Sequence, residues 1–452
     1  MSSDDVYPLF MLDDNKILHG IVVTWTLRFN DLLDADRLHT SLCRLLSIGD
    51  WRKVGGRLSR KVLPPPPFPT PLTSLDSTLE IHVPPTFTPA RPPLAYSHTA
   101  IPSNIDDHPL AKTLPTATPT SSIQRGSNEF RDFECRRDAP ATLEEYLIND
   151  TPLLSLHITS FNDATIVGLT WPHVLMDIMG QRALLHGWSL VLAGKESEVP
   201  ALGARGDALL FPDNQEEYRP QRLQGFGMFK FGLRFVADLL WNRVVETRTI
   251  FLPKAAVAKL QLQAQEDLSG EFVSEGDVLT AWATRAVASS MPSRPITALH
   301  PLNLRFRLPS LIEVPGVFVQ NMAVSAFSLL TPELLRGPLG PIALENRRQL
   351  MEQAAEPQLL ALLRDMRRDC TPGSDTAVLC GESNALLMPF TNSTRANVYQ
   401  AADFSAAVVR AGEGERNNPP GTMVYQHANS MRSSPTMRNV VVIHGKDHGD
   451  NY

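Results

Sequence analysis

Apolar residues recur along the first half of the chain with two different periods. Between residues 33 and 49, leucines three and four positions apart predict an amphipathic helix. Residues 155–171 instead alternate in two runs around an Asn-Asp pair, which is typical of a β-hairpin. An apolar stripe at helical spacing follows at once and predicts a helix that begins near Asp177 and ends at Gly194.

The second half mixes the same two patterns. Apolar spacing predicts helices over residues 254–265 and 274–290, and either a helix pair or one helix broken near Pro357 within residues 345–369. Ser274 is a good N-cap candidate for the second of these helices. Runs that resemble strands cover residues 318–330, 396–404, 421–428 and 438–445. Because strands and helices alternate without a regular βαβ repeat, we predict an α/β fold with a mixed sheet and helices in each half.

The length of the chain and a polar segment near its middle predict more than one domain. A chain of 452 residues is too long for one ordinary core. A polar segment over residues 201–224 separates the halves, so we expect an N-terminal domain at 1–200, a linker at 201–224 and a C-terminal domain at 225–452. Prolines cluster at residues 63–71, and residues 97–127, rich in Pro, Thr and Ser, predict a long surface loop.

Composition narrows the class of protein. A net charge of −6 argues against a nucleic-acid partner, which would require a clustered basic surface. The N-terminus is not typical of a signal peptide, and the most apolar later window, residues 225–241, contains three charges and cannot cleanly span a bilayer. The four cysteines (Cys43, Cys135, Cys370 and Cys380) are scattered and indicate neither a disulfide framework nor a zinc module. We therefore expect a cytoplasmic protein without a membrane partner, and a monomer.

The segment WPHVLMDIMGQRALLHGW, residues 171–188, carries the most suggestive chemistry. Leu169, Trp171 and His173 share one face of the predicted strand, so His173 is the last inward-facing residue before the chain turns. Apolar neighbours at such a strand end would keep the imidazole close to neutral, as a general base requires. Asp177 falls in the first turn of the following helix, where the helix dipole favours a carboxylate. A single H-x-x-x-D also arises often by chance, and a packed core histidine is the alternative interpretation.

Five further segments give this motif a context. The stretch from residue 160 to residue 195 resembles the central segment of the BAHD acyltransferases, and specifically their fungal relatives in the chloramphenicol acetyltransferase-like superfamily. That family shows a strand, His-x-x-x-Asp and a helix that ends in a Trp-containing turn. Further resemblances occur in the family's order at PLFMLDD, WRKVGGRL, SEGDVLTAWATRA, NLRFRLP with VPGVFVQNMAV, and VYQAADFSAA. Together these matches cover most of the chain.

The resemblance implies a reaction and a role for each matching residue. His173 would remove a proton from a hydroxyl or amine, which then attacks the thioester of an acyl-CoA. Asp177 would be structural and paired with an arginine, for which Arg305 is the candidate, and Asp403 would hold a loop at the domain interface. The active site would lie in a tunnel between two similar domains. Acyl-CoA is then a co-substrate, a small molecule of fungal specialised metabolism is the acceptor, and neither a metal nor a redox cofactor is needed.

The late segment departs from the family pattern. Residues 403–407 read Asp-Phe-Ser-Ala-Ala, so two glycines and a tryptophan associated with the oxyanion region are absent. Loss of one oxyanion donor can cost about a hundredfold in rate, so a substitute is expected. Thr391, Asn392 and Ser393 are candidate donors, although such loop residues more often satisfy the backbone.

Two other functions remain open at this point. One is a cyclase or condensing enzyme of the same fold, in which His173 transfers protons without CoA. The other is a non-catalytic binding protein that has kept the fold. A metal site at His444 and His448 is less favoured than a solvated tail, because no rigid element presents these groups.

Overall fold

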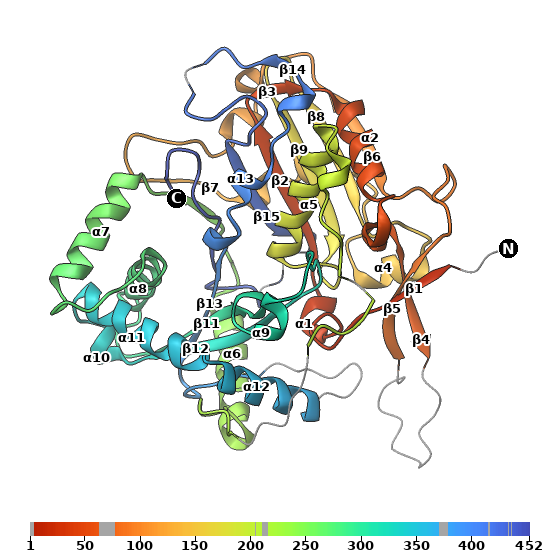
Figure 1. Ribbon diagram of the computed structural model, residues 1–452. Coiled ribbons are helices and arrows are strands. Elements are labelled where there is room, and N and C mark those ends of the chain that lie inside the picture. Colours follow the sequence, from red (N-terminus) through yellow and green to blue (C-terminus); the bar gives the residue numbers. More distant parts are fainter. Residues whose placement is uncertain are drawn as a thin grey trace.

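The computed structural model describes residues 4–62, 77–203, 205–209, 216–369, 378–414, 416–432, 434 and 436–452. Figure 1 shows two β-sheets, each accompanied by helices, with the first sheet in the upper part of the view and the second below and to the left. The predicted α/β class with two mixed-sheet bodies is confirmed.

The first sheet has five strands in the order β15-β2-β9-β8-β6. All neighbours are antiparallel except β6 and β8, which are parallel. The predicted hairpin forms its centre, because β8 and β9 pair on either side of residues 161–164. The strands are β2 (Val22–Phe29), β6 (Ala95–Ala100), β8 (Ser155–Ser160), β9 (Thr165–Pro172) and β15 (Tyr425–Ser430).

The second sheet has four strands in the order β12-β11-β13-β16. Its β11 pairs antiparallel with β12 and parallel with β13, which in turn is parallel to β16. The strands are β11 (Ile296–Asn303), β12 (Ala323–Leu330), β13 (Leu386–Asn392) and β16 (Val441–Ile443). The domain division at residues 201–224 stays a prediction. The strand order adds that β15, from the last part of the chain, completes the first sheet beside β2.

Within the described residues, three smaller sheets lie outside these two. They join β1 (Asp5–Pro8), β5 (Ser77–Val83) and β4 (Arg57–Val62), then β10 (Arg248–Phe251) with β7 (Ser122–Arg125), and β14 (Val408–Ala411) with β3 (Asp31–Leu33). The strand pair β3–β14, like β2–β15, joins residues from opposite ends of the chain.

Helices of both halves follow the predicted periodicity. Four of the predicted helices are α2 (Ala35–Leu45), α5 (Ile178–Leu192), α7 (Lys254–Glu266) and α8 (Glu275–Ala288). Ser274 caps α8 in a reciprocal capping box with Asp277, as its sequence position predicts. The helix pair near Pro357 is α11 (Leu339–Gln353) and α12 (Glu356–Asp369). The others are α1 (Lys16–His19), α3 (Arg131–Glu134), α4 (Leu143–Ile148), α6 (Gly225–Trp241), α9 (Pro309–Ile312), α10 (Pro332–Leu335) and α13 (Val398–Ala401).

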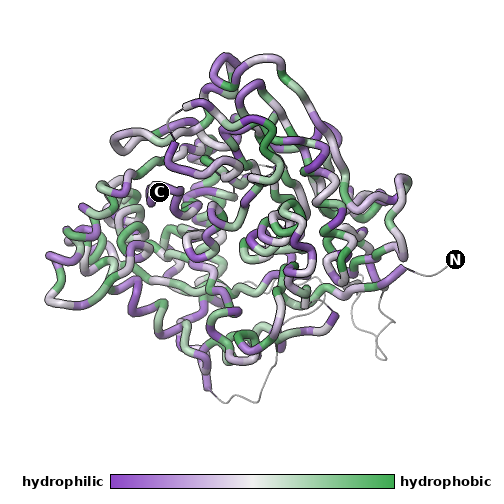
Figure 2. The backbone as a smooth tube through the Cα atoms, turned by 45° about the horizontal axis from the view of Figure 1, so that its top comes forward, coloured by the Kyte–Doolittle hydropathy of each residue, from purple (hydrophilic) through white to green (hydrophobic). Residues whose placement is uncertain are grey.

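The largest core lies between the first sheet and helices α2 and α5. Trp25 and Trp171 meet edge to face within it, and the Trp188 indole of α5 donates a hydrogen bond to the carbonyl of Leu38 in α2. Separate clusters fill the second half around α8 with α11, and around α9 with α12. In Figure 2, hydrophobic segments lie inside the body and hydrophilic segments lie along its outer loops.

Three predictions about local structure were wrong. Residues 396–404 contain the short helix α13 rather than a strand, because Asn397 adopts a left-handed conformation that starts it. Residues 97–127 include most of β6 and all of β7 rather than a continuous loop. The strand predicted over residues 318–330 begins only at Ala323. Cys370, the proline cluster at 63–71 and part of the 201–224 linker lie outside the described residues. Among the described residues, no helix is long and apolar enough to cross a membrane.

Candidate active site

His173 lies immediately after β9, at the end of the central strands of the first sheet. Its backbone N–H donates to the carbonyl of Ile21 at 2.9 Å, and its own carbonyl accepts from the Asn321 side chain at 2.9 Å. Leu169 and Trp171, which precede it on the same strand face, are fully buried. The predicted placement of the imidazole at a strand end with apolar neighbours is therefore present, and backbone contacts from two segments fix its main chain.

The surroundings of His173 keep its imidazole neutral. Burial lowers the pKa of His173 below its usual value of 6.5, and the nearby Asp177 carboxylate only partly opposes this shift. The Nδ1 atom is buried and has no hydrogen-bond partner among the described residues. A neutral imidazole has one ring nitrogen with a free lone pair, which is what proton abstraction requires.

Asp177 is the N-cap of α5 and is buried. Its Oδ1 accepts from the backbone N–H groups of Met179 and Gly180, at 3.0 and 3.1 Å. Its Oδ2 accepts from the Met322 N–H at 3.0 Å. Arg305 donates to both oxygens, at 2.8 and 3.1 Å. Five donors therefore hold this carboxylate, and its position is fixed by helix capping together with a bidentate ion pair.

Arg305 completes the connection between the two halves. It follows β11, in a short 3₁₀ turn over Leu304–Phe306, and its guanidinium also donates to the carbonyls of Phe318 and Gln320. The arginine therefore clamps the segment of residues 318–322 against the start of α5. This explains why β12 begins late: the polar backbone groups just before it bind Asp177 and Arg305 instead of a neighbouring strand.

A second buried network reaches His173 from the other side, and sequence reasoning missed it. Asp13 Oδ1 accepts from both the backbone N–H and the side chain of Asn321, at 2.7 and 2.9 Å, and Asn321 also holds the His173 carbonyl. Burial raises the pKa of Asp13 to about 6, although the nearby Lys53 and the bonds from Asn321 oppose the shift. Asp13 and Asn321 are 308 positions apart, and the resemblance to the family's opening strand and Asn segment was the one available signal.

Asp403 lies at the other end of α5. Its backbone N–H donates to the Ser189 hydroxyl at 2.9 Å, and its exposed side chain accepts from the Ser405 N–H at 3.0 Å. Ser189 is twelve residues after Asp177, a separation of about 18 Å along a helix. The structure therefore does not bring Asp403 near His173.

The three candidate oxyanion residues end β13 and begin the loop that follows. Asn392 Oδ1 accepts from the Thr394 N–H, and the Ser393 N–H donates to the Ile443 carbonyl, so both help to shape the turn. The half-buried Thr391 pairs through its backbone with Val442. The loop lies beside the Arg305 turn, because the Arg395 guanidinium stacks over the Phe306 ring at 3.8 Å.

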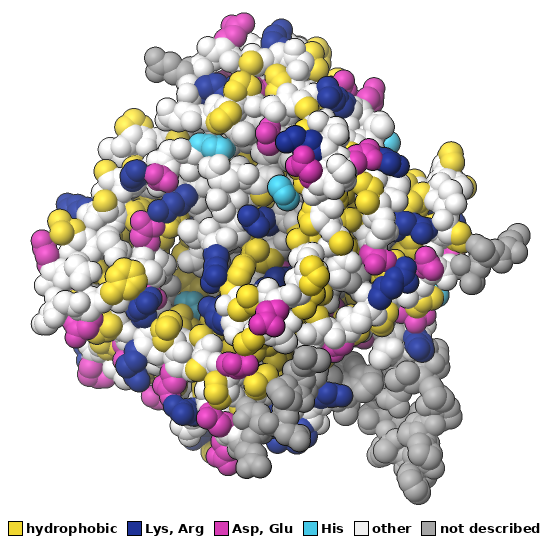
Figure 3. All heavy atoms as spheres, in the orientation of Figure 1, with side chains coloured by type: hydrophobic (Ala, Val, Ile, Leu, Met, Phe, Trp, Pro, Cys, Tyr) yellow, Lys and Arg dark blue, Asp and Glu magenta, His cyan; other side chains and the backbone are white. Residues whose placement is uncertain are grey.

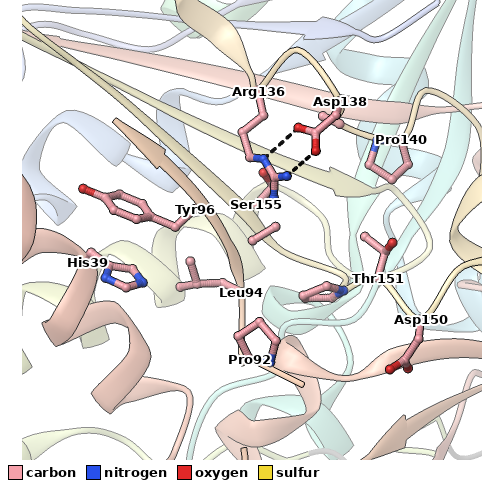
Figure 4. A pocket seen from close by; sticks show the side chains of 13 residues that line it. His39, Pro92, Leu94, Tyr96, Arg136, Asp138, Pro140, Asp150, Thr151 and Ser155 are labelled. Carbon is pink, nitrogen blue, oxygen red and sulfur yellow. Dashed lines mark hydrogen bonds and ion pairs between the residues drawn. The ribbon is translucent and has the colours of Figure 1, made fainter. Parts of the chain in front are cut away.

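A cavity of about 470 Å³ lies at the β6 edge of the first sheet, and His173 does not line it. Figure 4 shows the Arg136–Asp138 ion pair on one side of it and the stacked rings of His39 and Tyr96 on another. In Figure 3, acidic and basic side chains are interspersed over the face shown, without a continuous basic surface. Among the described residues, no three His, Cys, Asp or Glu side chains gather in a way that could hold a metal ion.

Comparison with known proteins adds to this geometry. The model of the Transferase family matches residues 138–418. The O-acetyltransferase PaAT-2 of Phomopsis amygdali is 33% identical over 99% of this chain and 94% of its own length, and the acetyltransferase BOT5 of Botryotinia fuckeliana is 33% identical over 99% and 87%. The crystal structure of F. graminearum TRI101 with coenzyme A and T-2 mycotoxin has the same fold, with a TM-score of 0.63 at 15% identity over 99% of this chain and 93% of that one. The chain thus belongs to the Transferase family and is an acyltransferase.

Proposed function

We propose that this protein transfers an acetyl group from acetyl-CoA to a hydroxyl group of a small molecule in fungal specialised metabolism. The choice of acetyl rests on the names of the relatives, several of which are acetyltransferases, and the choice of oxygen rests on PaAT-2, which is named an O-acetyltransferase. The site residues of this chain supply general-base catalysis, which suits a hydroxyl nucleophile that is protonated at neutral pH.

His173 performs the proton transfers. Its neutral imidazole removes the proton from the acceptor hydroxyl as the oxygen attacks the thioester carbon, which gives a tetrahedral oxyanion. When that intermediate collapses, the carbon–sulfur bond breaks, and the imidazolium returns the proton to the CoA sulfur. The lowered pKa of His173 favours the base form before the reaction begins.

This assignment of roles is supported by the fact that both carboxylate oxygens of Asp177 already accept hydrogen bonds. Its five donors are Arg305, which supplies two, and the backbone groups of Met179, Gly180 and Met322. A carboxylate held in this way has no remaining role as an orienting partner for the His173 ring. Asp177 and Arg305 therefore act by positioning the turn that carries His173, and catalysis rests on one histidine.

Thr391 and Ser393 are the remaining candidates for an oxyanion donor. The side-chain oxygen of Asn392 is used in the local turn, whereas neither the Thr391 nor the Ser393 hydroxyl makes a hydrogen bond within the described part of the chain. We place acetyl-CoA and the acceptor in a tunnel between the two sheet bodies, with His173 along it. All the groups named come from one chain, so a monomer suffices, and we place it in the cytoplasm.

The test is an acetyl-CoA turnover assay with a panel of hydroxylated and aminated acceptors, which detects both thiol release and the mass of the product. For an active acceptor we expect a mass gain of one acetyl group, and a fall in kcat/KM on the order of a thousandfold in His173→Ala. His186→Ala is the matched control, because His186 is an exposed histidine on α5, the helix that follows the His173 turn.

Other outcomes would overturn the proposal. Equal acceptor-dependent CoA release from wild type and His173→Ala would remove the histidine from the chemistry. A product of unchanged mass would indicate a cyclase that uses the same base. A product with a longer acyl chain, or acylation of amines alone, would correct the donor or the acceptor class.

A further inference from the structure

Helix α6 stands apart from the packed elements. It spans 17 residues, GFGMFKFGLRFVADLLW, and Figure 1 places it beside the second sheet, away from the first. None of its residues is buried, although most of them are apolar. An apolar helix that a core does not cover calls for an explanation, because exposed apolar patches on soluble proteins mark interaction surfaces.

The exposed apolar side chains form one stripe along the helix. They recur at alternating spacings of three and four positions, so they lie on a single face. Each exposes more than half of its surface: Phe226 70%, Phe229 60%, Leu233 56%, Val236 51% and Leu240 62%. Trp241, which ends the helix, is 89% exposed. At 1.5 Å per residue, α6 is about 25 Å long.

The opposite face attaches α6 to the body. Asp238 accepts a salt bridge from Arg294 at 2.8 Å through its side chain, and its backbone carbonyl accepts from Arg438 at 2.9 Å. Arg438 also donates to the carbonyl of Asn242, just beyond the helix. These bonds hold the helix by its polar side, and the apolar stripe therefore faces outwards.

The charges of α6 have a single sign on the outer side. Lys230 and Arg234 are both exposed and form no ion pair with any described residue. The Lys230 ammonium lies 4.6 Å from the centre of the Phe226 ring, beside the stripe. Asp238 is the helix's one acidic residue, and Arg294 already neutralises it. Aromatic and aliphatic side chains flanked by unpaired cations match a bilayer surface that carries anionic headgroups.

We propose that α6 docks this protein on the surface of an anionic phospholipid bilayer. The helix lies in the plane of the interface, with its stripe among the upper acyl chains and with Lys230 and Arg234 at the level of the phosphates. A helix that lies flat on the bilayer needs no membrane-spanning segment. The sequence predicted no membrane partner, and α6 now provides a surface for one. A second copy of this chain is a poorer occupant, because two facing stripes would bring these cations together without a free carboxylate.

Vesicle sedimentation of the full-length protein tests this proposal. Vesicles of phosphatidylcholine with phosphatidylserine are compared with vesicles of phosphatidylcholine alone. The doubly substituted Phe229→Gln/Leu233→Gln protein should lose at least about a hundredfold in partitioning, since burial of each side chain is worth more than tenfold. The Lys230→Gln/Arg234→Gln protein should lose roughly thirtyfold on the anionic vesicles and little on the neutral ones.

Leu262→Gln/Met351→Gln is the matched control. These two side chains are exposed to a similar degree, 61% and 59%, on α7 and α11, and their replacement should leave vesicle binding unchanged. The proposal fails if the wild type stays in the supernatant with both kinds of vesicle, or if the α6 variants bind as it does. It also fails if sedimentation velocity without lipid shows a wild-type dimer that Phe229→Gln/Leu233→Gln abolishes. Acyl transfer to a water-soluble acceptor, assayed without vesicles, should be equal in all of these proteins, so the two proposals fail separately.

Discussion

The two ends of helix α5 are held by different kinds of contact. At its N-terminal end, the buried Asp177 gathers donors from α5 itself, from Arg305 and from the segment that precedes β12. At its C-terminal end, the contacts are mainly apolar: the Trp188 ring packs on Phe404, which stacks on Phe29. Asp403, the acidic residue at this end, is exposed.

The two segments in which the sequence resembles family motifs lie at these different ends. The His-x-x-x-Asp motif lies at the polar end, where both halves of the molecule meet, and it is intact. The altered motif, residues 403–407, lies at the apolar end, about 18 Å away along the helix. The late motif can therefore diverge in sequence without removing a group that contacts His173, provided that its aromatic packing survives.

The largest effect on stability should follow from Asp177→Ala. This change leaves Arg305 buried without its counter-charge and removes the N-cap of α5, so we expect a loss of about 3–5 kcal/mol in the free energy of unfolding. The folded fraction should also lose on the order of a hundredfold in kcat, because the turn that carries His173 is no longer held in place. Urea unfolding and steady-state kinetics measure the two effects.

Asp177→Asn is the conservative comparison for that prediction. Its side-chain oxygen can still cap the helix, so α5 should remain, and the loss should come mainly from the missing charge opposite Arg305. An Asp177→Ala protein with wild-type stability and a wild-type kcat would show that the polar end of α5 has no positioning role.

Arg416→Ala should lower the free energy of unfolding without lowering kcat. Arg416 binds both oxygens of the buried Asp31 at 2.6 and 2.8 Å, and Asp31 also accepts from the Gly421 N–H, next to the Phe404 turn. Removal of the arginine leaves a buried carboxylate unpaired, which should cost about 3 kcal/mol. The folded fraction should keep its kcat within about twofold, measured at a temperature where both proteins are folded.

The pH dependence of that loss can be worked out from Asp31. Although burial alone would raise it, the bonds from Arg416 and two glycine N–H groups hold the pKa of Asp31 below 3.8. A lowered folded-state pKa stabilises the protein above the unfolded value, and this stabilisation disappears as the pH falls through the folded value. The difference in stability between wild type and Arg416→Ala should therefore shrink below about pH 4. A difference that stays constant down to acidic pH would argue against an electrostatic origin.

The sequence revealed the polar end of α5 more fully than the apolar end. His173 and Asp177 lie four positions apart, so a strand end and a helix start bring them together through local structure alone. Arg305 required the family resemblance, since nothing local pairs it with a residue 128 positions earlier. Asp13 and Asn321 were missed because their contact depends on how the first strands and the 318–322 segment pack.

Two of the three errors in local structure have the same physical origin. The apolar run over residues 318–322 has the composition of a strand, but Arg305 and Asp177 bind its backbone groups, and tertiary contacts therefore override the pattern. Residues 398–401 form a helix because their apolar side chains pack against α5, and alternation alone does not report such a contact.

The acidic side of the pH profile of kcat/KM tests the role of His173 at the polar end of α5. Because burial lowers the pKa of His173 below 6.5, the imidazole stays neutral as the pH falls through 6.5. We therefore expect kcat/KM to be flat near neutral pH and to fall about tenfold per pH unit only below the lowered pKa. Arg416→Ala should have the same profile. A midpoint above 6.5 would mean that His173 is solvated, or that a different group is the base.

Asp403→Ala should have the smallest effect of the four, and it is the most direct test of the apolar end. The substitution removes one acceptor from the Ser405 N–H at an exposed position, where water can replace it, so the cost should be about 1 kcal/mol or less. The bond from the Asp403 backbone to Ser189 is independent of the side chain and should persist. The value of kcat should change by less than about twofold, because among the described residues no hydrogen bond or ion pair links this carboxylate to the polar end of α5. A hundredfold fall in kcat with unchanged thermal stability would contradict the division of α5 into a catalytic and a packing end, and would require the late motif to act on the reaction from a distance.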